Sequence, residues 1–235
     1  MITAFRRALG HGSESVRLQA ALAAGTSPDP GFVDGLIERC AVEPDFFVRD
    51  MLTWALTRHP AALTVPRLVA ELSAESAQAR SQALHTLSKI GDGSAWPAIT
   101  RAHLTDPDDE VARAAWRTAA ALVPAGSEAG LAAVLATQLG RGGVSTRLSL
   151  SQALIVLGEP ASSVLRVAAG DPDPGVREHA IATERLWSDP DGGFELAVAQ
   201  AERIVALGPG AGRPQALDAA AGVTVVGAVG SAGGE

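Results

Sequence analysis

Residues 44–56 read PDFFVRDMLTWAL, in which a proline and an acidic residue come directly before a helix with one apolar face. An apolar side chain returns at the i, i+4, i+7 and i+8 positions, which are Val48, Leu52, Ala55 and Leu56. This spacing is that of an amphipathic α-helix. The acidic residue can cap free N–H groups of the first turn, and proline fits where no donor is needed. The stretch therefore predicts a helix whose apolar stripe packs against a neighbour.

This pattern returns along the chain at a nearly constant interval. The related segments are SESVRLQAAL (13–22), SAQARSQALHTL (76–87), DEVARAAWRTAA (109–120), VSTRLSLSQAL (144–154) and DPGVREHAIA (173–182). Each contains an arginine after a small or β-branched residue, and the six arginines are Arg17, Arg49, Arg80, Arg113, Arg147 and Arg177, separated by 32, 31, 33, 34 and 30 residues. A fixed period in this range indicates a repeat architecture. One alignment stays open, because the tetrapeptide Ser-Gln-Ala-Leu at 81–84 and 151–154 would place Leu150 opposite Arg80.

A shorter apolar segment comes before each of these helices, at about residues 2–9, 32–41, 62–72, 95–104, 128–139 and 161–169. Two short helices cannot bury their own apolar faces, so neighbouring pairs stack into a continuous core. We therefore predict an all-α superhelix, an α–α solenoid of about six helix pairs, over residues 1–207, with a capping helix at 192–207. The glycine-rich segment 208–235 has no helical period and is expected to be a disordered tail.

Composition narrows the class of protein. Hydrophobic residues make up 47% of the 235 residues, aromatic residues only 4%, and tyrosine is absent, which suits helices packed closely through alanine and leucine. The net charge of −7 argues against broad, nonspecific attraction to nucleic acid or to an anionic membrane. The single Cys40 has no partner for an internal disulfide, and no apolar run of about eighteen residues occurs. We expect a cytoplasmic protein.

The acidic turn, the Val-Arg pair and the alanine- and leucine-rich helix together resemble the HEAT-like repeats of the phycobilin lyase type, which also occur in many bacterial proteins. The resemblance covers roughly residues 1–190, and Pro66 and Pro97 resemble the family's kinked first helix. It implies a HEAT-like or armadillo-type solenoid in which the second helix of each pair lines the concave face. It does not imply a particular activity.

Two interpretations of the repeated arginines compete. In HEAT-like repeats an arginine at this position typically pairs with acidic groups near its own or the adjacent turn, and Asp45, Asp108, Asp109 and Asp173 are placed to serve. The alternative is a positive stripe that contacts phosphates or carboxylates along a groove. We favour the internal ladder.

Polar and aromatic positions of the second helices that lie away from the buried stripe are candidates for binding a partner on the concave face: Trp54, Arg58, His59, His85, Lys89 and Arg117. Tryptophan and arginine are the residue types that most often anchor interfaces. Trp116, Arg185 and Trp187 lie near the border of the stripe. For the tryptophans at 54, 116 and 187, a place in the core between repeats is the competing interpretation.

Catalytic and metal-binding patterns are sparse. No His-Glu dipeptide of the kind that holds a di-iron centre in some HEAT-repeat hydroxylases occurs, and the five histidines are scattered over different repeats. No nucleophile elbow, phosphate-binding loop or dinucleotide fingerprint is present. We therefore predict no cofactor, no metal and no enzymatic activity.

These observations favour a binding scaffold that engages a protein partner on its concave surface. One alternative is a protein that handles a small molecule or chromophore or senses a ligand. A less favoured alternative is a DNA-binding module resembling the HEAT-like alkylpurine DNA glycosylases, which need a basic groove. The oligomeric state and the partner's identity do not follow from the sequence.

Overall fold

The computed structural model describes residues 2–190 and 193–207, and the predicted tail at 208–235 lies outside the described residues. Helices, and no strands, make up the regular structure of the described part, which confirms the predicted all-α superhelix with a HEAT-like arrangement of helix pairs. None of the described helices is both long enough and apolar enough to cross a membrane.

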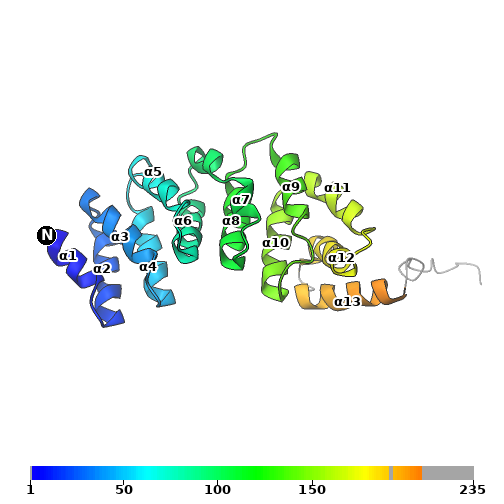
Figure 1. Ribbon diagram of the computed structural model, residues 1–235, viewed down its shortest axis with the longest axis horizontal. Helices are drawn as coiled ribbons and strands as arrows, with labels where there is room; N and C mark the ends of the chain where they lie inside the picture. Colours follow the sequence, from blue (N-terminus) through cyan, green and yellow to red (C-terminus); the bar gives the residue numbers. More distant parts are fainter. Residues whose placement is uncertain (1, 191–192, 208–235) are drawn as a thin grey trace, which may run out of the picture.

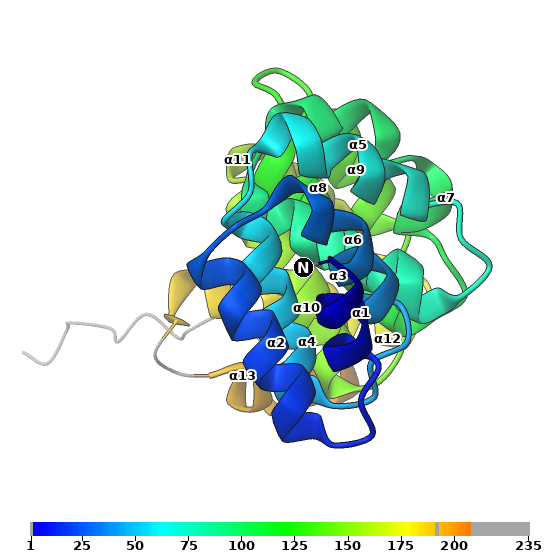
Figure 2. The same cartoon turned by 90° about the vertical axis from the view of Figure 1, so that its left-hand side faces the viewer.

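The helix pairs follow one another along the long axis of the molecule (Figure 1). The first helices are α1 (Ile2–Leu9), α3 (Val33–Cys40), α5 (Ala61–Glu71), α7 (Arg101–Leu104), α9 (Glu128–Ala136) and α11 (Glu159–Ala168). The second helices are α2 (Glu14–Thr26), α4 (Phe46–Thr57), α6 (Ala77–Ile90), α8 (Asp109–Leu122), α10 (Val144–Val156) and α12 (Pro174–Ser188). Short 3-10 helices, η1 (Pro30–Phe32) and η2 (Gly93–Ala98), come before α3 and α7. Figure 2 shows α5, α9 and α11 on one side of the molecule and α2 and α4 on the other.

Neighbouring second helices pack directly on one another, in the order α2, α4, α6, α8, α10 and α12. Alanine permits this close approach, and Ala55 and Ala115 are fully buried beside leucines such as Leu52 and Leu84. The largest fully buried side chain is Trp116, whose Nε1 donates to the Leu104 carbonyl at 2.8 Å. The core is therefore continuous between repeats rather than confined to each pair.

The acidic residues expected to pair with the repeated arginines mostly have another role. The carboxylates of Asp45, Asp108 and Asp173 accept backbone N–H groups at the starts of α4, α8 and α12. They are helix caps, because a short acidic side chain at this position satisfies donors that the helix leaves unpaired. Asp109 pairs with Arg141, not with a repeat arginine.

The repeated arginines bind chiefly the turn that comes before their own helix. The Nη1 atoms of Arg17, Arg49, Arg80 and Arg177 each donate to two consecutive carbonyls, five and six residues earlier, at 2.6–3.1 Å. The Nε of Arg147 donates to the Gly142 carbonyl, also five residues earlier. This common geometry supports the alignment through Arg147 rather than through Leu150, and it gives these five arginines a structural role.

Glu43 is the most strongly bound carboxylate at these turns. It is fully buried, and its oxygens accept from Arg17 Nε and Nη2, both at 2.7 Å, and from Arg39 Nε at 2.6 Å. The Asp45 N–H adds a further hydrogen bond. Burial alone would raise the pKa of Glu43, but these donors outweigh it and lower the pKa to about 2. The carboxylate therefore stays charged and ties the turn before α4 to α2 and α3.

The predicted capping helix is α13 (Phe194–Leu207), which packs against α12 at the C-terminal end of the solenoid (Figure 1). Phe194, Ala197 and Ala201 are buried there, in a cluster with Ala182. The helix covers the apolar face that α12 would otherwise leave without a neighbour.

Candidate binding groove

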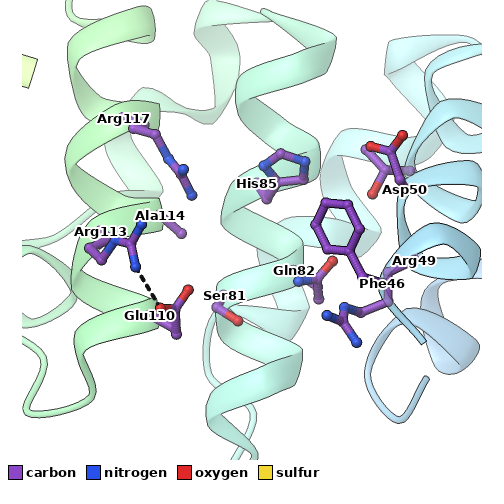
Figure 3. Close-up of a pocket in the computed structure, with 11 residues that line it drawn as sticks. Phe46, Arg49, Asp50, Ser81, Gln82, His85, Glu110, Arg113, Ala114 and Arg117 are labelled. Carbon is purple, nitrogen blue, oxygen red and sulfur yellow. Dashed lines mark hydrogen bonds and ion pairs between the residues drawn. The ribbon is translucent and has the colours of Figure 1, made fainter. Parts of the chain in front are cut away.

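A pocket of about 350 Å³ opens on the layer of second helices, between α4, α6 and α8 (Figure 3). We call it the groove, and its lining residues are Phe46, Arg49, Asp50, Thr53, Ser81, Gln82, His85, Glu110, Arg113, Ala114 and Arg117. The lining combines an aromatic ring, three guanidinium groups, an imidazole and two carboxylates. Such a mixture is typical of sites that orient a ligand through a few polar groups.

The α4 side of the groove has an exposed aromatic surface. The adjacent side chains of Phe46 and Phe47 are 65% and 72% exposed, and their rings meet edge to face with centroids 5.7 Å apart. The guanidinium of Arg49 lies 5.9 Å from the centre of the Phe46 ring. Two neighbouring exposed phenylalanines cost hydrophobic free energy, so they mark a candidate contact surface.

On the α8 side of the groove, the spacing between the N-cap and the repeat arginine is one residue longer than in the other repeats. Five of the repeat arginines come four residues after their N-cap, as Arg80 does after Ser76, whereas Arg113 comes five residues after Asp108. One residue turns a side chain by about 100° around a helix. The Arg113 side chain consequently points into the groove instead of toward the turn before α8 (Figure 3).

Another arginine binds the turn that Arg113 leaves. Arg141, in the connection between α9 and α10, donates through Nη2 to the Asp106 carbonyl at 2.6 Å and to the Pro107 carbonyl at 3.1 Å. Its Nε binds the Asp109 carboxylate at 2.9 Å. The turn is therefore satisfied, while the Nη1 of Arg113 binds only Glu110, at 2.8 Å, and its buried Nε has no hydrogen-bond partner among the described residues.

Positive charge gathers at this side of the groove. No described carboxylate lies within 4 Å of the Arg117 guanidinium, in contrast to Arg113. Partial desolvation by the groove walls, and then the charge of Arg113, lower the pKa of Arg117, and Glu110 opposes this effect. Burial, followed by the charges of Arg117 and Lys89, lowers the pKa of His85. The imidazole is therefore neutral at pH 7, and the guanidinium of Arg117 is available to an anion.

The predicted partner-binding residues occupy different places. His85 and Arg117 line the groove, and Lys89 is exposed one turn further along α6. Arg58 is exposed at the end of α4. Trp54 is 36% exposed, and its ring packs over Gly25 of α2, so close that a Cβ at Gly25 would collide with it.

The expectation that His59 is exposed for binding a partner is corrected by the structure. It is only 6% exposed, and its ring nitrogens lie 2.9 Å from the Ala55 carbonyl and 3.2 Å from the Asp29 carbonyl. The expected outward direction assumed a continuing helix, but α4 ends at Thr57 and the chain turns inward. Trp116 is likewise fully buried, and Trp187 is half-buried against the core, in agreement with the competing interpretation of these two tryptophans.

Phe46 and Arg113 were not selected from the sequence as groove residues. Phe46 follows an N-cap and is part of a helix start, where an aromatic residue gives no sign of its exposure. For Arg113 a signal is present, because the run of acidic residues at 108–110 lengthens the distance from cap to arginine by one residue.

Other reactive groups do not converge on the groove. Cys40 is buried on α3, and burial raises the pKa of its thiol to about 12. Within residues 2–190 and 193–207, no three His, Cys, Asp or Glu side chains come together in a way that could hold a metal ion.

The chain matches no protein-family model and no curated protein sequence. Two solved structures with a similar course of the chain are human deoxyhypusine hydroxylase in complex with glycerol and the complex of CpcE and CpcF of phycocyanin lyase from Nostoc sp. PCC7120. The first is 17% identical, with a TM-score of 0.44, over 88% of this chain and 96% of the other. The second is 17% identical, with a TM-score of 0.36, over 86% and 94%.

The prediction that the chain is not an enzyme is wrong as drawn from the sequence, because one of these two similar structures is a hydroxylase. At this similarity neither structure transfers an activity or a ligand to this chain.

Proposed function

We propose that the chain is a binding protein that engages a segment of a protein partner in the groove between α4, α6 and α8. The observation that supports this function best is the exposed Phe46–Phe47 pair beside the guanidinium groups of Arg113 and Arg117. Aromatic residues and arginine are enriched at protein interfaces, since they combine apolar area with directed hydrogen bonds. The groove also opens on the layer of second helices, where side chains of a partner segment can enter its volume of about 350 Å³.

The charge pattern favours a protein segment over nucleic acid. Asp50 and Glu110 stand in the groove, and the whole chain has a net charge of −7. A nucleic acid backbone presents a phosphate at every nucleotide and needs a row of cations without interspersed carboxylates. A protein segment can place a single anion at the cationic side and an apolar side chain at Phe46.

Photo-crosslinking in the native cell tests the proposal. A photoreactive residue replaces Gln82 in the groove, and a control replaces Val167, which is 79% exposed on α11 in the other layer. We expect one discrete protein adduct from position 82 and none from position 167. Equal adducts from both positions, or none from position 82 when the variant is folded and abundant, would count against the proposal.

A second candidate function rests on a separate hollow of about 720 Å³, lined mainly by apolar side chains of α1, α2 and η1. Phe5, Ala23 and Phe32 are among its lining residues. Its size and lining suit a small apolar ligand. Native mass spectrometry of the purified protein would show such a ligand as added mass that an Ala23→Phe variant loses. A protein without added mass in both forms would speak against this candidate.

A further inference from the structure

The release of Arg113 from the repeat pattern creates a pair of cations that the other repeats lack. Arg113 and Arg117 are one helical turn apart on α8, and their side chains enter the same groove (Figure 3). In the neighbouring repeat the matching arginine, Arg80, is fully engaged with the Ala74 and Glu75 carbonyls and with Asp106. The α8 pair is therefore not required by the fold in the way that the five arginines which bind the turn before their own helix are.

The immediate surroundings leave this pair short of negative charge. Glu110 binds Arg113 but is itself exposed, and no described carboxylate reaches Arg117. Lys89 adds a third cation near His85. The charges of Lys89 and Arg117 both lower the pKa of His85. A buried guanidinium N–H without an acceptor is costly, so the unpaired Nε of Arg113 shows that the described residues do not fully satisfy this side chain in its place at the groove.

We propose that Arg113 and Arg117 form a carboxylate-binding site, so that the partner is recognised through an acidic side chain with an apolar side chain next to it on Phe46. This rests on the proposed function and specifies its chemistry. A guanidinium binds a carboxylate through two parallel hydrogen bonds, and the exposed guanidinium of Arg117, which no described carboxylate reaches, has its donors available for this, with the charge of Arg113 beside it. Glu110 orients Arg113 by holding its Nη1.

The groove favours a single negative charge over a phosphate dianion. Asp50 and Glu110 line the same space as Arg49, Arg113 and Arg117, so three cations and two carboxylates leave the lining one net positive charge, which a single negative charge on the ligand balances. The neutral His85 contributes no charge to offset a second one. An acidic peptide therefore fits the site better than a phosphate group.

A titration with defined probes tests this site. The probes are a six-residue peptide of alternating glutamate and leucine, acetylated at its N-terminus and amidated at its C-terminus, its glutamine counterpart with the same caps, and inorganic phosphate. The readout is the Nε–Hε resonances of Arg113 and Arg117 in the 15N-labelled protein. We expect a saturable shift of these resonances with the glutamate peptide, no saturable shift with the glutamine peptide, and weaker binding of phosphate. Equal shifts with both peptides, or tighter binding of phosphate, would overturn the assignment.

Variants supply the specificity control. Arg117→Gln and Arg113→Gln should each weaken the binding of the glutamate peptide by about tenfold. This is the effect of one lost charge-assisted hydrogen bond. Arg101→Gln removes an exposed cation on α7, outside the groove, and should have no effect. Arg113→Lys keeps the charge but not the planar pair of donors, so it tests the geometry if the glutamine variant is poorly folded.

The cellular crosslink separates the two proposals. If the adduct from position 82 forms with the wild type and persists in the Arg113→Gln, Arg117→Gln double variant, a partner lies in the groove but carboxylate recognition is refuted. If the titration shows the carboxylate site and position 82 gives no adduct, the site stands and the protein partner in the groove is refuted.

Discussion

His179 gives the fold a predictable sensitivity to acid. It is 1% exposed on α12, where its Nδ1 accepts from the Gly140 N–H at 3.0 Å and its Nε2 lies 3.0 Å from the Arg147 carbonyl. These contacts require the neutral ring with the proton on Nε2, because Nδ1 must accept. Burial, with help from the charge of Arg147, lowers the pKa of His179 from 6.5 to about 4, although the Arg147 carbonyl opposes the shift.

The sign and size of the effect follow from this pKa. A histidine whose pKa is lowered by folding stabilises the protein above its unfolded pKa, and that contribution is lost as the pH falls from 6.5 toward 4. For one proton, values of 6.5 and about 4 give a loss of about 2 kcal/mol in the free energy of unfolding between about pH 7 and pH 5, and about 3 kcal/mol in full.

Urea unfolding followed by circular dichroism at several pH values between about pH 7 and pH 5 measures this loss. The His179→Gln variant should be less stable at pH 7, yet its free energy of unfolding should fall by about 2 kcal/mol less over the same range. Thr118→Val, which removes a buried hydroxyl from α8 but no titrating group, controls for destabilisation itself and should keep the wild-type pH dependence.

An equal pH dependence in the wild type and in His179→Gln would refute the reasoning. If the variant does not fold, imidazole 15N resonances of the wild-type protein report the same quantity directly. A His179 that titrates at its ordinary pKa in the folded protein would then contradict the account.

Three further predictions concern the packing between repeats. Glu43→Gln leaves the guanidinium of Arg17 without its carboxylate and should lower the free energy of unfolding by about 3 kcal/mol in urea titrations; an unchanged midpoint would show that the buried pair contributes no net stability. Gly25→Ala places a Cβ against the Trp54 ring and should cost about 1–3 kcal/mol, most of which a second change, Trp54→Leu, should restore; additive effects in this double-mutant cycle would deny the contact. Trp116→Phe deletes the donor to the Leu104 carbonyl, and a loss of about 1–3 kcal/mol is expected in the same assay, whereas no loss would mean that the bond contributes nothing.

The fold was predictable because its signal is repeated. Each second helix has an apolar stripe, and in five of the six the arginine comes four residues after the N-cap, so an error in one repeat is corrected by the others. The Arg49 and Arg177 pattern, with Nη1 on two turn carbonyls, explains why arginine recurs: a long side chain with several donors closes the turn before its own helix.

The groove was predictable only in part, because it depends on departures from the repeat. His85 and Arg117 follow from the helical period, since both lie within long helices. His59 does not, because it comes after the end of α4, where the helical period no longer gives the direction of a side chain. Arg113 depends on a one-residue shift that also requires Arg141, a residue from the next repeat, to bind the vacated turn. Sequence spacing alone does not show that Arg141 takes the place of Arg113 at this turn.

The most direct test of the groove is the affinity of the crosslinked partner, once identified and purified, for three forms of this protein. The forms are the wild type, Arg117→Gln in the groove and Arg101→Gln outside it. The account predicts a dissociation constant raised about tenfold or more by the first substitution and unchanged by the second, because Arg117 lines the groove where the partner's carboxylate binds and Arg101 does not. Equal affinities for all three forms would contradict it.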